Sequence, residues 1–87
     1  MKIRLPYIFY HLTDGIESVH AEARTLGECL NVLQNKYPAI KTRLFDEQGH
    51  LYKYVELYLN GTKIDNCLEL PVKDEDELYI SVVIYGG

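Results

Sequence analysis

The spacing of apolar residues along the chain predicts several short strands. In four segments, apolar or aromatic side chains recur at every second position, which is the period of a strand with one buried face. These segments are 3–10, 16–23, 55–59 and 78–85. Asn60-Gly61 predicts a turn after the third segment, and residues 62–65 are expected to return as a short further strand.

One amphipathic helix is predicted between these strands. Residues 25–28, Thr-Leu-Gly-Glu, have the form of a capping box, in which the threonine hydroxyl accepts a hydrogen bond from the backbone of the glutamate. Over 26–37, apolar residues recur at intervals of three and four and form one stripe. The stripe consists of Leu26, Leu30, Leu33 and Tyr37. Pro38 is expected to end this helix, because the residue before a proline avoids the α region, and a second short helix is expected over 39–45.

The order of these elements predicts an α+β fold of the β-grasp type. Two strands precede the helix and two or three follow it. One helix covers only one face of a sheet, so two layers are expected. If the first and last strands are parallel neighbours, the helix supplies the right-handed crossover that joins them. We therefore predict a mixed sheet of four to five strands with one main helix on one face, in a single domain over residues 1–87.

Charge and composition argue against several functional classes. The net charge is −4, which opposes phosphate binding even though eight tyrosines could offer stacking surfaces for nucleic acid. The acidic run 74–77 is expected to be a solvated turn. No apolar run approaches the roughly 20 residues of a membrane span, and the first residues do not resemble a signal peptide. A cytoplasmic protein, monomeric when free, is therefore expected.

Metal binding and catalysis by the chain itself are not expected. The three histidines are scattered, and none stands at a ligand spacing from a cysteine. Cys29 lies beside the apolar stripe of the helix and is expected to be buried, whereas Cys67 lies in a connecting segment. No serine or cysteine has an evident base beside it, so the sequence predicts no nucleophilic active site.

The most informative motif is Gly86-Gly87, directly after the last strand segment. At an average glycine content of about 7%, two consecutive glycines at a given place occur by chance roughly 0.5% of the time. Glycines form a thin thread that can enter a narrow active site of another protein. A carboxylate carried on such a thread becomes open to attack by sulfur or an amine once it is activated as an acyl phosphate.

An ordered series of motifs resembles the ThiS/MoaD family of sulfur carriers, which are ubiquitin-like β-grasp proteins, and covers essentially residues 1–87. The series consists of Met1–Leu5, Thr25–Glu28, Lys36–Pro38, Leu44–Asp46, Tyr54–Gly61, Val72–Leu78 and Gly86-Gly87. Leu5-Pro6 and the insert-like region 46–54 resemble the CysO/MoaD-like branch. The turn 74–76 lacks the glycine usual in this family, so a different turn type is expected there.

The resemblance implies a mechanism in which the chain is a cosubstrate and not a catalyst. An E1-like enzyme of the MoeB/ThiF type would use ATP and Mg²⁺ to adenylate the carboxylate of Gly87. A sulfur donor would then convert the acyl group to a thiocarboxylate, which passes its sulfur to a biosynthetic enzyme, for instance in cysteine synthesis. Gly86 would be the thread behind the modified residue, and no cofactor would be bound by the chain itself.

Two other functions use the same tail. In one, the chain is a ubiquitin-like modifier that forms isopeptide bonds with lysines through Gly87. In the other, it is a small subunit of an enzyme such as molybdopterin synthase, and the tail reaches into the large subunit.

A docking surface for the partner enzymes is predicted on the sheet face away from the helix. The helix is expected to cover the face that bears Leu57, Leu59, Ile80 and Val82. The opposite face would then carry Ile8, Tyr10, Tyr58, Tyr79 and Val83. The alternative is that these side chains only fill strand positions. Tyr85, directly before Gly86-Gly87, is bulky and would have to fit the partner's channel.

Overall fold

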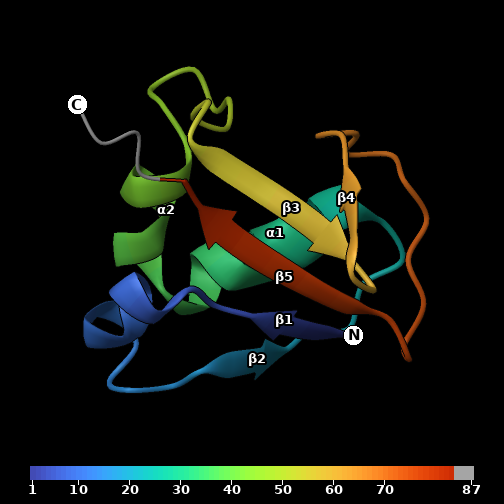
Figure 1. Cartoon of the computed structure of the whole chain (residues 1–87), viewed down its shortest axis with the longest axis horizontal. Coiled ribbons are helices and arrows are strands. Elements are labelled where there is room, and N and C mark those ends of the chain that lie inside the picture. The colour runs from blue at the N-terminus through green and yellow to red at the C-terminus, as the bar shows by residue number, and fades with distance from the viewer. Residues whose placement is uncertain (84–87) are drawn as a thin grey trace.

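A five-stranded mixed sheet forms the framework of the molecule (Figure 1). The computed structural model describes residues 1–83, and residues 84–87 lie outside the described part of the chain. The strands are β1 (Lys2–Arg4), β2 (Ser18–His20), β3 (Val55–Leu59), β4 (Thr62–Ile64) and β5 (Glu77–Val82). They are arranged in the order β2-β1-β5-β3-β4. β1 and β5 are parallel and the other pairs are antiparallel, which confirms the predicted β-grasp arrangement.

Two helices cover one face of the sheet. The main helix, α1 (Leu26–Lys36), begins as predicted, because the Thr25 hydroxyl oxygen accepts a hydrogen bond from the Glu28 N–H at 3.2 Å. The second helix, α2 (Pro38–Leu44), has Pro38 in its first turn, where the missing N–H costs no hydrogen bond. The chain therefore turns a corner at this proline and continues as a helix, one residue earlier than predicted.

The core lies between the helices and the sheet. Leu57 and Ile80 are opposite each other on β3 and β5 and are buried, and Leu59 and Val82 pack against the same core. The predicted helix-facing side of the sheet is therefore confirmed. The helices contribute their apolar stripes to this core, and these consist of Leu26, Cys29, Leu30, Leu33, Ile40 and Leu44.

The prediction of one strand over 3–10 was wrong. β1 ends at Arg4, and a 3₁₀ helix, η1 (Tyr7–Leu12), follows Pro6. Pro6 has no N–H to continue a ladder, and its carbonyl oxygen accepts a hydrogen bond from the Phe9 N–H at 2.9 Å, which starts the helical turn. This turn points Phe9 into the core, where it is 4% exposed.

Other element bounds differ less. The second predicted strand, 16–23, is only Ser18–His20, and the predicted strand 78–85 is seen as Glu77–Val82, with its last two residues outside the described part of the chain. The turn before β5 closes by a hydrogen bond from the Asp76 N–H to the Lys73 carbonyl oxygen at 3.0 Å, and residues 74–76 have no positive φ. A turn without a glycine therefore fits this sequence, as expected.

Candidate functional site

The strand that leads to Gly86-Gly87 is a central strand of the sheet. β5 has β1 on one side and β3 on the other. Its path is fixed as far as Val83, whose N–H donates a hydrogen bond to the Tyr54 carbonyl oxygen at 2.7 Å. Tyr85, Gly86 and Gly87 themselves lie outside the described residues. The structure therefore defines the point from which the predicted tail leaves, at the end of the sheet where β1 ends and β3 begins.

Two tyrosines meet on the open face of the sheet. Tyr58 on β3 and Tyr79 on β5 are cross-strand partners, with ring centroids 6.4 Å apart and ring planes inclined by 43°. Tyr79 is 39% exposed. The Arg4 guanidinium lies 6.0 Å from the centroid of the Tyr79 ring and pairs with the Glu77 carboxylate at 3.4 Å. A cation and an ion pair therefore border this ring pair on the β1 side.

A second ion pair borders the ring pair on the β4 side. The Tyr58 hydroxyl donates a hydrogen bond to one oxygen of Glu56 at 3.0 Å, and the Lys63 ammonium lies 3.0 Å from the other oxygen. The hydrogen bonds from Lys63 and Tyr58 lower the pKa of Glu56, and the hydrogen bond to Glu56 raises the pKa of Tyr58. The open face thus carries an aromatic centre between two charged pairs that span four strands.

Only part of the predicted docking face comes together. Tyr58 and Tyr79 do meet, and Val83 directly follows the last residue of β5. Ile8 and Tyr10 do not join them, because both belong to η1 and not to a strand. Ile8 is 41% exposed, and Tyr10 is half-buried with its ring against that of Tyr7, the centroids 5.6 Å apart.

Sequence reasoning missed the charged residues around the ring pair. These are Arg4, Glu56, Lys63 and Glu77. Their positions in the strand alternation place them on the open face, but which charges pair depends on the register between strands. The Asn60-Gly61 turn fixes the register between β3 and β4, which carry Glu56 and Lys63, but no local pattern specifies the register between β1 and β5, which carry Arg4 and Glu77.

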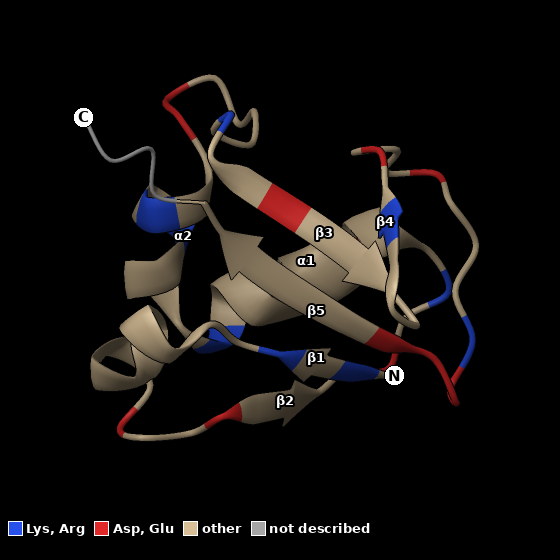
Figure 2. Cartoon of the chain, in the orientation of Figure 1, with Lys and Arg blue, Asp and Glu red and all other residues tan. Residues whose placement is uncertain are grey.

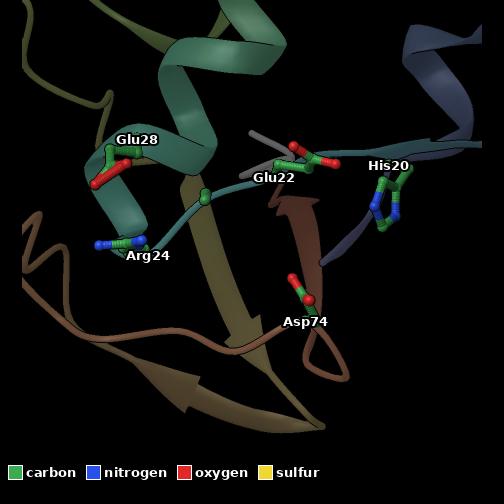
Figure 3. Close-up of a pocket in the computed structure, with 6 residues that line it drawn as sticks. His20, Glu22, Arg24, Glu28 and Asp74 are labelled. Carbon is green, nitrogen blue, oxygen red and sulfur yellow. The ribbon is translucent and has the colours of Figure 1, made fainter.

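A hollow of about 390 Å³ lies at the beginning of α1 (Figure 3). Its lining is mostly charged and consists of His20, Glu22, Ala23, Arg24, Glu28 and Asp74. Within residues 1–83, no group of three His, Cys, Asp or Glu side chains is placed to hold a metal ion. Over the same residues, no helix is long and apolar enough to cross a membrane.

The two cysteines differ in environment. Cys29 is buried on α1, and burial raises the pKa of its thiol to about 11, so the reactive thiolate is suppressed. Cys67 is exposed in the segment between β4 and β5. The predicted locations of both thiols are confirmed.

Comparison with known proteins decides the family. No family model matches the chain. It is 30% identical over 89 residues to the sulfur carrier protein CysO of Mycobacterium bovis, and the match covers 98% of this chain and 96% of the relative. The chain belongs to the ThiS/MoaD-like family of sulfur carriers. CysO of Mycobacterium tuberculosis matches equally well, so the predicted branch of the family is confirmed.

Solved structures agree with this membership. CysO in the Amycolatopsis orientalis BexX/CysO complex superposes on this sulfur carrier with a TM-score of 0.84 at 31% identity, covering 99% of this chain and 98% of that one. SAMP1 of Haloferax volcanii gives a TM-score of 0.86 at 26% identity, covering 100% and 98%. Both similarities extend over the whole fold, and the first is to a carrier solved together with a partner protein.

Proposed function

We propose that the carboxyl group of Gly87 carries the sulfur. The carboxylate attacks the α-phosphorus of ATP in an E1-like enzyme, pyrophosphate leaves, and an acyl adenylate forms. Hydrosulfide released by a sulfur donor then attacks the acyl carbon, AMP leaves with loss of one proton from the sulfur, and a thiocarboxylate remains. The end-to-end similarity to CysO sulfur carriers carries this proposal, together with the position of Gly86-Gly87 in the sequence shortly after a central strand, β5, which ends at Val82.

The division of labour follows from the chemistry. A carboxylate is a poor electrophile, and the mixed anhydride with phosphate supplies the leaving group that it lacks. ATP and Mg²⁺ are bound by the activating enzyme, which we assign to the MoeB/ThiF type, and the carrier is consumed and regenerated as a cosubstrate. Because the activation uses ATP, we place the reaction in the cytoplasm. A biosynthetic acceptor enzyme then removes the sulfur and restores the carboxylate.

Mass spectrometry of the intact carrier tests the reaction. After incubation with the activating enzyme, ATP, Mg²⁺ and a sulfide source, the mass should change by the replacement of one oxygen by sulfur, located at Gly87. A chain without Gly86 and Gly87 is the matched control and should stay unmodified. An unmodified wild-type chain would contradict the proposal, provided that the same enzyme preparation modifies a known carrier.

The Tyr58–Tyr79 pair on the open face is our candidate contact for partner enzymes. Exposed aromatic side chains beside charged groups are typical of protein interfaces. Tyr58→Asp should raise the KM for the carrier in the adenylation reaction without unfolding the domain. Tyr7→Asp is the matched control, because Tyr7 is 81% exposed but belongs to η1. Equal KM values for wild type and a folded Tyr58→Asp variant would remove this surface from the proposal.

A ubiquitin-like modifier is the second candidate. The observation that favours it is the similarity to structures of small archaeal modifier protein 1, at 26% identity for Haloferax volcanii and 28% for Methanosarcina acetivorans. In that function an amine of a target lysine, and not sulfur, attacks the activated Gly87 acyl group. Conjugates of higher mass in cells, absent when Gly87 is deleted, would support it.

A further inference from the structure

The short reach of the tail limits where an activating enzyme can bind. Four residues separate Val83 from the proposed reacting group, the Gly87 carboxyl. Four residues span at most about 14 Å even when fully extended. An enzyme that acts on Gly87 must therefore bring its active site within about this distance of Val83. Its surface must then cover the surroundings of Val83, whatever else it touches.

The surroundings of Val83 are the end of α2 and the segment that follows it. Tyr54 accepts the hydrogen bond from Val83, and its hydroxyl donates to the Arg43 carbonyl oxygen at 3.3 Å. The Tyr52 N–H donates to the Leu44 carbonyl oxygen at 2.9 Å, and the Tyr52 ring stacks on the Tyr54 ring at 5.1 Å between centroids. The carboxyl end of α2 is thus tied to the base of the tail by a stacked aromatic pair.

This end of α2 is basic and exposed. Lys41 and Arg43 stand in the last turn of the helix, both are exposed, and neither forms an ion pair with any residue of the described chain. Asp46 and Glu47 follow in the next turn, but one oxygen of Asp46 already accepts hydrogen bonds from two backbone N–H groups. An open hollow of about 450 Å³ beside this turn is lined by Lys41, Tyr52 and the carboxylates of Asp46 and Glu47 among others, so of the two cations only Lys41 borders it.

The opposite end of the sheet is acidic. The run 74–77 leads directly into β5. In Figure 2 red ribbon marks the acidic run that leads into the beginning of β5, and blue ribbon marks α2 toward the end where β5 finishes, followed by a red segment. The net charge of −4 means that an acidic partner repels the molecule as a whole, so the basic end of α2 would orient any approach to it.

We propose that Lys41 and Arg43, beside the Tyr52–Tyr54 stack, form a docking surface for an acidic region at the mouth of the activating enzyme's active site. The inference rests on the proposed function, in which Gly87 is the group acted upon. The two cations attract the enzyme's carboxylates at the end of the carrier that bears the tail, and the acidic end is turned away. Charge complementarity of this kind mainly raises the association rate and fixes orientation.

Matched charge-neutralising variants test this surface. The double variant Lys41→Gln/Arg43→Gln removes both cations near the tail, and Arg24→Gln/Lys73→Gln removes one arginine and one lysine at the acidic end. Initial rates of pyrophosphate release are measured against carrier concentration at several salt concentrations. Because electrostatic steering changes association rates by about 10- to 1,000-fold, we expect kcat/KM to fall at least about tenfold for the α2 variant, with kcat nearly unchanged.

The expected pattern has two further parts. The Arg24→Gln/Lys73→Gln control should keep the wild-type kcat/KM within about twofold, and salt should lower kcat/KM for wild type more steeply than for the α2 variant. Circular dichroism verifies that both variants are folded. Equal kcat/KM for the α2 variant and wild type, or an equal fall in both double variants, would overturn the docking surface. Failure of the proposed function looks different, because wild type itself would then release no pyrophosphate with a competent enzyme.

Discussion

Replacing Leu30 by alanine is the most direct test of how α1 holds the sheet together. Leu30 is 1% exposed and lies between Leu26 and Leu33, which are both fully buried. Truncation of a buried leucine to alanine costs about 3 to 5 kcal/mol, from lost transfer free energy and the cavity that remains. A domain of 87 residues has a total stability of about 4 to 13 kcal/mol, so this single change removes a large part of it.

Urea denaturation followed by far-ultraviolet circular dichroism measures the effect. Leu30→Ala should lower the midpoint strongly and leave the slope m unchanged, and Tm should fall by at least about 12 °C. Asn31→Ala is the matched control, because Asn31 is the exposed next residue and alanine has the higher helix propensity. A loss below about 1 kcal/mol for Leu30→Ala, with the control unchanged, would refute the packing described for α1.

Three further predictions concern a carboxylate, the thiols and the base of the tail. Hydrogen bonds from Asn60 and the Lys73 N–H lower the pKa of Asp76 below its ordinary value of 3.8. The ionised carboxylate therefore stabilises the folded state above pH 3.8, and this stabilisation is lost as the pH falls through the lowered pKa. In an Asp76→Asn variant the free energy of unfolding should depend less on pH in that range, and an unchanged pH dependence would contradict the prediction. Alkylation should label Cys67 quickly in the native protein and Cys29 only in denaturant. Rapid labelling of both cysteines in the native protein, detected by mass spectrometry, would contradict the burial of Cys29 on α1. Asp46→Ala removes the oxygen that accepts hydrogen bonds from the turn after α2, so it should speed hydrogen exchange at the Val83 amide. Asp46→Asn keeps an acceptor oxygen and should speed this exchange much less. Equal exchange rates in both variants would show that the turn after α2 does not hold the base of the tail.

The strands and helix that could be predicted are those whose local pattern agrees with their tertiary role. The strict alternation of Val55–Leu59 has one face on the core and one in solvent, and the structure preserves it. The capping box at Thr25 works by short-range hydrogen bonds, so it needs no tertiary context. The prediction that the helix supplies the crossover was conditional on parallel pairing of the first and last strands, and β1 and β5 do pair in this way.

The segment after Pro6 shows where local pattern fails. Its alternation from Ile3 to Phe9 suits a strand, but burial of Phe9 by a 3₁₀ turn satisfies the same apolar positions. Pro6 has no backbone N–H, and this favours the 3₁₀ turn over a continued strand. How strongly it does so depends on whether a neighbouring strand would have accepted a hydrogen bond at that position. Ile8 and Tyr10 were placed on the sheet face through this predicted strand, so their placement on that face was wrong as well.

The two candidate docking surfaces depend on contacts between distant residues. Arg4 and Glu77 are 73 positions apart, and they meet because β1 and β5 are parallel with Arg4 opposite Tyr79. Tyr54 meets Val83 because the chain from α2 returns to β3 beside the end of β5. Neither contact has a local signal in the sequence, so charge and aromatic content could indicate candidate residues but not their arrangement.

The position of β5 explains how the chain that leads to Gly86-Gly87 leaves the sheet at a fixed point. A strand at the edge of a sheet has one row of unpaired backbone groups, whereas β5 has a neighbour on each side. β3 pairs with β5 from Leu78 to Val82, and the hydrogen bond from Val83 to Tyr54 continues this support by one residue. The exit point of the tail therefore stays fixed relative to both the Tyr58–Tyr79 face and the basic end of α2. Substitutions on either surface should consequently change how an enzyme binds the carrier without moving the point from which Gly87 is presented.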